Sequence, residues 1–316
     1  MRAHELLARV EEAARRRHLD VESHPLSYRA GDFRLLKLRS PDIHPTDRVM
    51  LIQAGIHGDE IAGPVAFADH FDRIVDAVHA GGLKLIAYPL VNPSGFEAGV
   101  RYNVDHDPGP EGNSDFLRYE LLDGRWVSEL APDAQFRRWV WSSELRPPPP
   151  LPVETALMHR LLRADPLAQV IVALDLHQDH LTPGLGPAAY HYAFGDLTRY
   201  APIVDAIARR APVLRHVPIG AGFDVRIDEK GAVTAPVDPS EARATDEHGF
   251  IVRHDGSFSD LFFRLGAAHS ITSETSGATP LDLACEIAVL WIEGLACLAG
   301  DLAPAPPAHG TVHVPS

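Results

Sequence analysis

Short apolar segments that end abruptly in polar residues recur along the chain and predict buried β-strands. Between them, apolar residues recur at helical spacing and predict helices. Strands that alternate with helices are typical of an α/β protein built on a largely parallel sheet. The predicted strands cover residues 49–54, 83–91, 170–174, 188–194 and 268–272, and the predicted helices cover residues 61–80, 153–163, 197–210 and 281–298.

Two long segments do not follow this alternation. Residues 104–151 and 218–259 are rich in Gly, Pro, Trp or charge, and they predict long loops over the strand ends, where α/β proteins bind ligands. We expect residues 1–300 to form a single domain that carries both loops. The residues after it, 301–316, predict a flexible Pro/Ala-rich tail.

The N-terminal segment and the cysteines indicate a cytoplasmic protein. Residues 1–18 interleave charged and apolar side chains at helical spacing and lack the uninterrupted apolar core of a secretory signal. Cys285 and Cys297 lie on one predicted helix, too far apart to form a disulfide, which indicates free buried thiols. Apolar runs such as residues 287–292 are shorter than the roughly 20 residues of a membrane helix, so no membrane span is expected.

The net charge of the chain limits the classes of partner that it is expected to bind. It has 29 Lys and Arg against 43 Asp and Glu, a formal net charge of −14. Without a basic surplus, a nucleic acid or an anionic membrane is not an expected partner. A small molecule or a peptide is the expected substrate, and the sequence gives no indication of an oligomeric partner.

The most specific chemical signal is the sequence AGIHGDE at residues 54–60, between a predicted strand and a predicted helix. His57 and Glu60 are separated by two residues, so a tight turn can bring the imidazole and the carboxylate to one point, as a zinc ion requires. The alternative is a polar turn in which Asp59 and Glu60 lie near a helix N-terminus, where the helix dipole favours carboxylates.

Two later strand ends carry residues that would complete such a site. His177 supplies a third ligand if its strand lies next to the first one, and Asp175 and His180 are alternatives to it. Glu274 follows the last apolar strand. A carboxylate that projects from a strand end toward a metal can act as general base and then as general acid.

Taken in order, the motifs of this chain resemble those of the zinc carboxypeptidase superfamily, which includes the aspartoacylase and succinylglutamate desuccinylase branch. The resemblance implies a three-layer α/β/α sandwich with a mixed, largely parallel central sheet of about eight strands. The motifs are HGDE at 57–60, NPSG at 92–95, RYN at 101–103, DLH at 175–177 and SET at 273–275.

The same resemblance implies the roles of the site residues. His57, Glu60 and His177 would bind one Zn²⁺ per chain. Glu274 would be the general base and acid, and Arg101 would polarise the scissile carbonyl and hold the oxyanion.

The chain departs from the family pattern in two places that bear on the substrate. Many members have an adjacent Asn-Arg pair that grips a substrate carboxylate, whereas here Asn113 is followed by Ser114 and the nearest arginine is Arg118. Either Arg118 reaches the site, or a carboxylate is not recognised in the usual way. Peptidase members also place a tyrosine on a late loop, and no tyrosine follows Tyr200 here.

These observations lead to one main hypothesis and its alternatives. The main hypothesis is a zinc-dependent hydrolase that cleaves a peptide or amide bond by metal-activated water, as a carboxypeptidase-like metallopeptidase. The alternative within the enzyme class is an N-acyl amino acid amidohydrolase of the aspartoacylase or succinylglutamate desuccinylase type. The alternative from another class is a catalytically inactive module that binds zinc or a ligand.

Overall fold

A computed structural model describes most of the chain. The described residues are 1–105, 117–127, 130–131, 134–141, 151–182, 184–219, 225–227, 233–236, 243–252, 254 and 256–301, with the backbone alone at 225–227, 233–236 and 243.

One eight-stranded mixed sheet organises the molecule, as the resemblance implied. Its four central strands are parallel, because β3 pairs in parallel with β4 and β8, and β8 pairs in parallel with β15. Antiparallel pairs extend the sheet on both sides, β2 against β4 and β9 against β15. The order across the sheet is β1 (Asp20–Tyr28), β2 (Gly31–Arg39), β4 (Lys84–Tyr88), β3 (Val49–Ala54), β8 (Val170–Asp179), β15 (His269–Ser276), β9 (Ala189–Ala193) and β14 (Phe250–Ile251).

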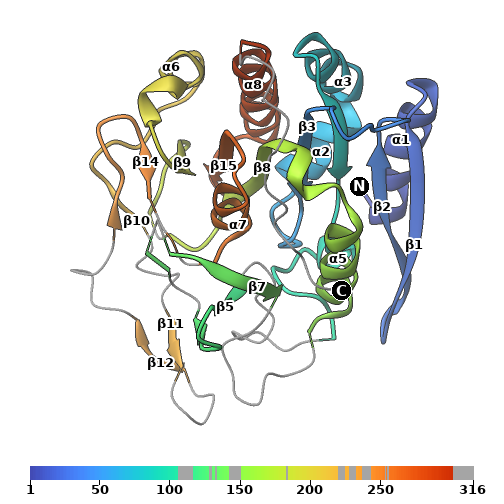
Figure 1. Cartoon of the computed structure of the whole chain (residues 1–316), viewed down its shortest axis with the longest axis horizontal. Helices are drawn as coiled ribbons and strands as arrows, with labels where there is room; N and C mark the ends of the chain where they lie inside the picture. The colour runs from blue at the N-terminus through green and yellow to red at the C-terminus, as the bar shows by residue number, and fades with distance from the viewer. Residues whose placement is uncertain are drawn as a thin grey trace.

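Helices cover both faces of this sheet and give three layers (Figure 1). In the view of Figure 1, α6, α8 and α3 lie above the sheet, and α7 and α5 lie below it. The first layer contains α1 (Ala3–Arg16), α2 (Ala62–Asp69), α3 (Phe71–Ala80), α6 (Ala201–Ala208) and α8 (Leu281–Gly300), and the other contains α5 (Val153–Ala164) and α7 (Phe258–Arg264). The single helix predicted over 61–80 is divided at His70, which ends α2 and precedes α3.

Two central strands are longer than their apolar segments predict. β8 continues past Leu174 to Asp179, and β15 continues past Thr272 to Ser276. The strand ends expected at 174 and 272 are therefore wrong, because the two polar segments pair with each other and complete their backbone hydrogen bonds. In this register Glu274 lies opposite His177.

The short apolar runs in the sequence of helix α8 predict no membrane span. Among the described residues it is long and apolar enough to cross a membrane by length and composition alone. More than half of its apolar window is buried, however, and its residues belong to the main apolar core together with α2, α3 and the sheet. A core helix of a globular protein passes the same test.

The segment 104–151, expected as a long loop, contains a three-stranded antiparallel sheet of β5 (Leu117–Leu121), β6 (Trp126–Val127) and β7 (Phe136–Trp141). Side chains alternate along β5 and β7, so that Leu117, Tyr119, Trp139 and Trp141 face the core and are buried. The tryptophans thus pin this segment onto the sheet, as burial of large aromatic area favours.

The segment 218–259 contains short strand pairs and contacts the small sheet. β10 (Pro218–Ile219) pairs with β13 (Arg243–Ala244), and β11 (Val225–Ile227) pairs with β12 (Val233–Pro236). The backbone N–H of Leu117 donates to the carbonyl of Gly256 (2.7 Å). The two segments expected as separate loops are therefore hydrogen-bonded to each other.

Candidate metal centre

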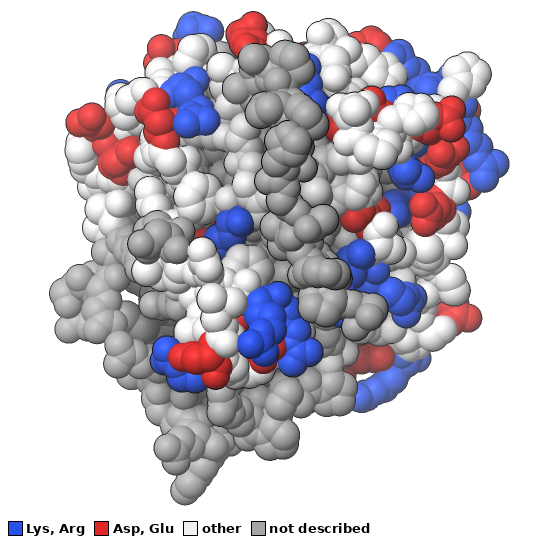
Figure 2. All heavy atoms as spheres, viewed as in Figure 1, with Lys and Arg blue, Asp and Glu red and all other residues white. Residues whose placement is uncertain are grey.

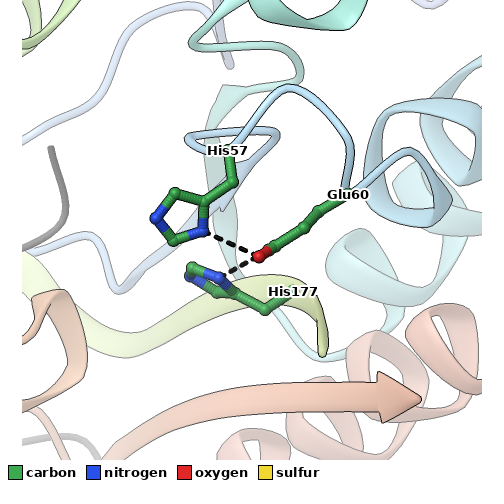
Figure 3. Close-up of side chains that lie close together, drawn as sticks. All are labelled: His57, Glu60 and His177. Atoms are coloured by element: carbon green, nitrogen blue, oxygen red, sulfur yellow. Dashed lines mark hydrogen bonds and ion pairs between the residues drawn. The ribbon is translucent and has the colours of Figure 1, made fainter. Parts of the chain in front are cut away.

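Three side chains that are far apart in the sequence point toward one another at the carboxyl end of the central strands (Figure 3). His57 Nδ1 lies 2.8 Å from Glu60 Oε1, and His177 Nδ1 lies 2.7 Å from Glu60 Oε2. All three residues are buried, and one ligand atom from each lies within 4.8 Å of the others. They are the residues that the sequence predicted as zinc ligands.

The sheet brings these residues together because β3 and β8 are neighbours. Ala54, the last residue of β3, pairs with Leu176, so the turn that follows β3 reaches His177. Within that turn, a Cβ on Gly58 would lie 2.1 Å from the carbonyl carbon of Gly95. Only glycine fits at position 58, and the close approach packs the turn against α4 (Pro93–Ala98).

Hydrogen bonds join the HGDE, NPSG and RYN motifs into one unit. Asn92 caps α4 by accepting from the backbone N–H of Gly95 (2.9 Å), and its Nδ2 donates to the carbonyl of Arg101 (3.2 Å). The same carbonyl accepts from the N–H of Gly58 (2.9 Å). The side chain of Arg101 then reaches the metal-ligand group, where Nη1 lies 2.7 Å from Glu60 Oε1.

The charges in this group stabilise one another. Burial alone would raise the pKa of Glu60, but the imidazoles of His57 and His177 hold it well below its ordinary value. Burial alone would lower the pKa of His177, but the carboxylates of Asp175 and Glu60 raise it well above its ordinary value.

Asp175 lies behind His177 and not among the converging ligand atoms. Its Oδ2 lies 3.0 Å from His177 Nε2, and both of its oxygens accept from Gln53 Nε2 (3.2 Å each). A carboxylate in this place orients a ligating imidazole and raises its basicity. Sequence reasoning missed Gln53, although a glutamine inside the apolar strand VMLIQA is the signal that could have found it.

Glu274 lies beside the group on the neighbouring strand. It is only 4% exposed, and among the described residues its Oε2 has no hydrogen-bond partner. Burial raises the pKa of Glu274 well above its usual range, and the carboxylates of Glu60 and Asp179 add to the increase. A buried carboxylate oxygen without a partner is costly, which indicates a position that a ligand or water is meant to complete.

The residues present fit a zinc ion. Two imidazole nitrogens and a carboxylate converge in a buried site, and this is a donor set that zinc accepts. The carboxylate of Glu274, with one oxygen that has no partner among the described residues, lies on the strand beside these ligands.

The structure describes only one of the two predicted substrate-binding residues. Asn113 lies outside the described residues. Arg118 lies in β5, where its Nη2 donates to the carbonyl of Trp126 (3.2 Å) within the small sheet. The sequence reasoning, which found no tyrosine after Tyr200, did not single out Tyr190 on the strand next to β15. Tyr190 lies opposite Glu274 on β9 and donates to Asp179 Oδ2 (3.0 Å).

Comparison with solved structures identifies the fold. A candidate metallopeptidase from Shewanella amazonensis SB2B superposes with a TM-score of 0.63 at 20% identity, covering 96% of this chain and 94% of that one. One from Shewanella denitrificans OS217 gives 0.59 at 20% identity, covering 93% and 90%. A metallo-carboxypeptidase from Burkholderia cenocepacia gives 0.53 at 13% identity, covering 92% and 67%. The chain has a carboxypeptidase-like fold.

A family model supports the same relationship from the sequence. The Succinylglutamate desuccinylase/Aspartoacylase catalytic domain matches residues 46–108, the part of the carboxypeptidase-like fold that contains the HGDE, NPSG and RYN motifs. The family model and the fold comparison both agree with the resemblance to the zinc carboxypeptidase superfamily, the first over residues 46–108 and the second in the fold.

Proposed function

We propose that this chain is a zinc-dependent hydrolase that cleaves a peptide or amide bond, and that it acts as a carboxypeptidase-like metallopeptidase. The observation that carries the proposal is the arrangement of Glu274. Its unpartnered carboxylate oxygen is buried opposite His177, beside the converging ligands His57 and Glu60. A structural carboxylate would be hydrogen-bonded, whereas an acid–base residue leaves one oxygen for the reacting water.

The side chains divide the chemistry among them. His57, Glu60 and His177 would hold one zinc ion, which when bound polarises a carbonyl and lowers the pKa of water. Glu274 takes a proton from the attacking water and donates it to the leaving nitrogen, as general base and then general acid. Arg101, whose guanidinium already reaches Glu60, stabilises the negative charge that develops on the substrate oxygen.

A second candidate function has its own support. The desuccinylase and aspartoacylase family model matches the motif-bearing residues 46–108, which favours an N-acyl amino acid as substrate. The fold comparison favours the peptidase. Both functions would use the same metal ligands and the same base, so the substrate that is hydrolysed distinguishes them.

The expected partners and location belong to the same proposal. We expect a small-molecule or peptide substrate and a cytoplasmic protein, without a nucleic-acid or membrane partner. The net charge of −14 supports this expectation. On the face drawn in Figure 2, the described Lys and Arg side chains are interspersed with Asp and Glu.

A mass-spectrometric screen tests the proposal. Zinc-loaded protein is incubated with short peptides and N-acyl amino acids, beside the Glu274→Gln protein. Loss of single C-terminal residues from peptides with a free carboxylate, but not from their amidated counterparts, would support a carboxypeptidase. Release of acetate, succinate or another small acid would support the second candidate. Retention of zinc without hydrolysis of any amide, ester or peptide would overturn the proposal and favour an inactive binding module.

A further inference from the structure

A buried carboxylate that has no role in the proposed reaction lies at the start of α5. Glu154 is fully buried, and both of its oxygens accept from Asn103 Nδ2 (2.9 Å each). Its Oε2 also accepts from the hydroxyl of Tyr28 (3.1 Å). A carboxylate is an expensive group to bury for the sake of packing alone, so the partner that it holds deserves an explanation.

Asn103 links this carboxylate to the proposed active site. It is 2% exposed and lies two residues after Arg101, and its Oδ1 accepts from the backbone N–H of Asp105 (3.0 Å). The side chain of Asn103 is therefore fixed on both its amide nitrogen and its oxygen. This fixes the backbone on the C-terminal side of Arg101.

The backbone carbonyl of Arg101 itself is fixed by different groups. The carbonyl of Arg101 accepts from the N–H of Gly58 and from Asn92 Nδ2. Arg101 is thus held between the metal-ligand turn and the Asn103–Glu154 pair. Its side chain, 9% exposed, leaves this backbone toward Glu60. A misplacement of about 1 Å in a catalytic group can cost about 10²-fold in rate, so such a backbone must be held tightly.

We propose that Glu154, acting through Asn103, is a positioning residue for Arg101. The catalytic consequence rests on the proposed function of Arg101. The effect on the position of Arg101 does not rest on that function, because the Asn103–Glu154 pair holds Arg101 whether or not the chain hydrolyses a substrate.

The other end of α5 offers a matched control. Asp165 is the residue that ends this helix, and like Glu154 it is buried and accepts from a tyrosine hydroxyl, that of Tyr88 (2.5 Å). Its other partner is Lys37 Nζ (2.6 Å) rather than an asparagine beside Arg101. Asp165→Asn therefore removes a comparable buried charge without touching the Arg101 segment.

The first readout does not require catalysis. Metal-free and zinc-loaded proteins are treated with phenylglyoxal, and the rate of modification at Arg101 is followed by peptide mass spectrometry. We expect Glu154→Gln to raise this rate several-fold and Asp165→Asn to leave it as in the parent. Arg264, whose side chain is 2% exposed and which pairs with Asp260, serves as the internal reference arginine.

The second readout is kinetic, and it includes a double variant that exchanges the amide of Asn103 and the carboxylate of Glu154. When kcat is expressed per zinc-loaded protein, Glu154→Gln should lower it about 10-fold or more with little change in KM. The reason is that the contact of Arg101 with the transition state is weakened. Asn103→Asp, which places two carboxylates together, should do the same. The double variant Asn103→Asp with Glu154→Gln restores one donor and one acceptor and should recover most of the parent kcat and the parent phenylglyoxal rate.

Three results would overturn the inference. They are an unchanged phenylglyoxal rate in Glu154→Gln, an equal increase in Asp165→Asn, and a double variant that resembles the single variants. If Glu154→Gln does not fold, the comparison of Asn103→Asp with the double variant decides. A parent protein without hydrolytic activity contradicts the proposed function, and the phenylglyoxal comparison still tests the positioning of Arg101.

Discussion

Two clusters of charged side chains are buried beside the central sheet, and they differ in how their polar atoms are used. In the first, Lys37 and Tyr88 satisfy both oxygens of Asp165, from Nζ at 2.6 Å and from the hydroxyl at 2.5 Å. In the second, His57, Glu60 and His177 converge within 4.8 Å, and among the described residues Glu274 Oε2 has no partner.

The two clusters thus differ in whether the hydrogen bonds of their buried carboxylates are complete. Asp165 is buried with a cation and a hydroxyl that use both of its oxygens, so nothing further is needed there. In the second cluster, one carboxylate oxygen of Glu274 accepts no hydrogen bond from any described residue. The side chains of His57, Glu60 and His177 beside it carry nitrogen and oxygen atoms of the kind that bind zinc. Buried charge alone therefore does not indicate function, and it is the oxygen of Glu274 without a described partner, next to converging ligand atoms, that led us to propose one.

The largest expected effect comes from Glu274→Gln. The amide cannot take the proton of the attacking water, so kcat should fall by about 10²- to 10⁴-fold while zinc remains bound. Steady-state kinetics with metal analysis of the same sample measure both quantities. Asp165→Asn is the matched control, and it should keep the parent kcat per folded molecule. Parent-like turnover in Glu274→Gln would remove the proposed role of this residue.

Lys37→Met is expected to lower the stability of the protein without lowering its activity. This substitution leaves Asp165 buried without its cation, and the loss of one partner of a buried pair costs about 3–5 kcal/mol. The free energy of unfolding from urea titration should fall by that amount, while kcat per folded molecule stays unchanged. A variant that keeps its stability but loses activity would place the Lys37 cluster among the functional groups.

A smaller effect is expected from Asp175→Asn. The asparagine still contacts His177 Nε2 but cannot polarise the imidazole as a carboxylate does, so zinc affinity should fall about 10- to 100-fold. Competition with a chromophoric chelator measures the change. Zinc affinity equal to that of the parent would show that Asp175 does not support the ligand.

The last expected effect concerns pH and Glu154. Burial raises the pKa of Glu154 from 4.5 to about 7, so in this interval the folded protein binds a proton that the unfolded chain has released. The free energy of unfolding should therefore fall as pH rises from about 4.5 to about 7, and Glu154→Gln should remove this contribution. Urea midpoints across this interval measure it. The same pH slope in parent and variant would contradict the assignment.

The sequence was most informative where contacts are local or where a pattern is strong. Apolar runs predicted β3, β4 and β9, and the two-residue separation of His57 and Glu60 predicted a turn that brings them together. His177 and Glu274 were predicted through the resemblance, which carries information about neighbouring strands that the spacing of residues does not contain.

Other features could not be predicted because their partners are distant in sequence. The polar ends of β8 and β15 are strand only because they pair with each other. Tyr88 and Asp165, 77 residues apart, and Asn103 and Glu154, 51 residues apart, meet only in the packed structure. β1 and β2 were also missed, because β1 is partly exposed and does not form a continuous apolar run.

The central claim is that the incompletely bonded cluster is a metal centre built from His57, Glu60 and His177. Native mass spectrometry of zinc-loaded protein tests it most directly, with the parent compared with Glu274→Gln and His177→Ala. The account predicts one zinc per chain in the parent and in Glu274→Gln, and none in His177→Ala. A parent that binds no zinc, or a His177→Ala protein that binds as much as the parent, would contradict it.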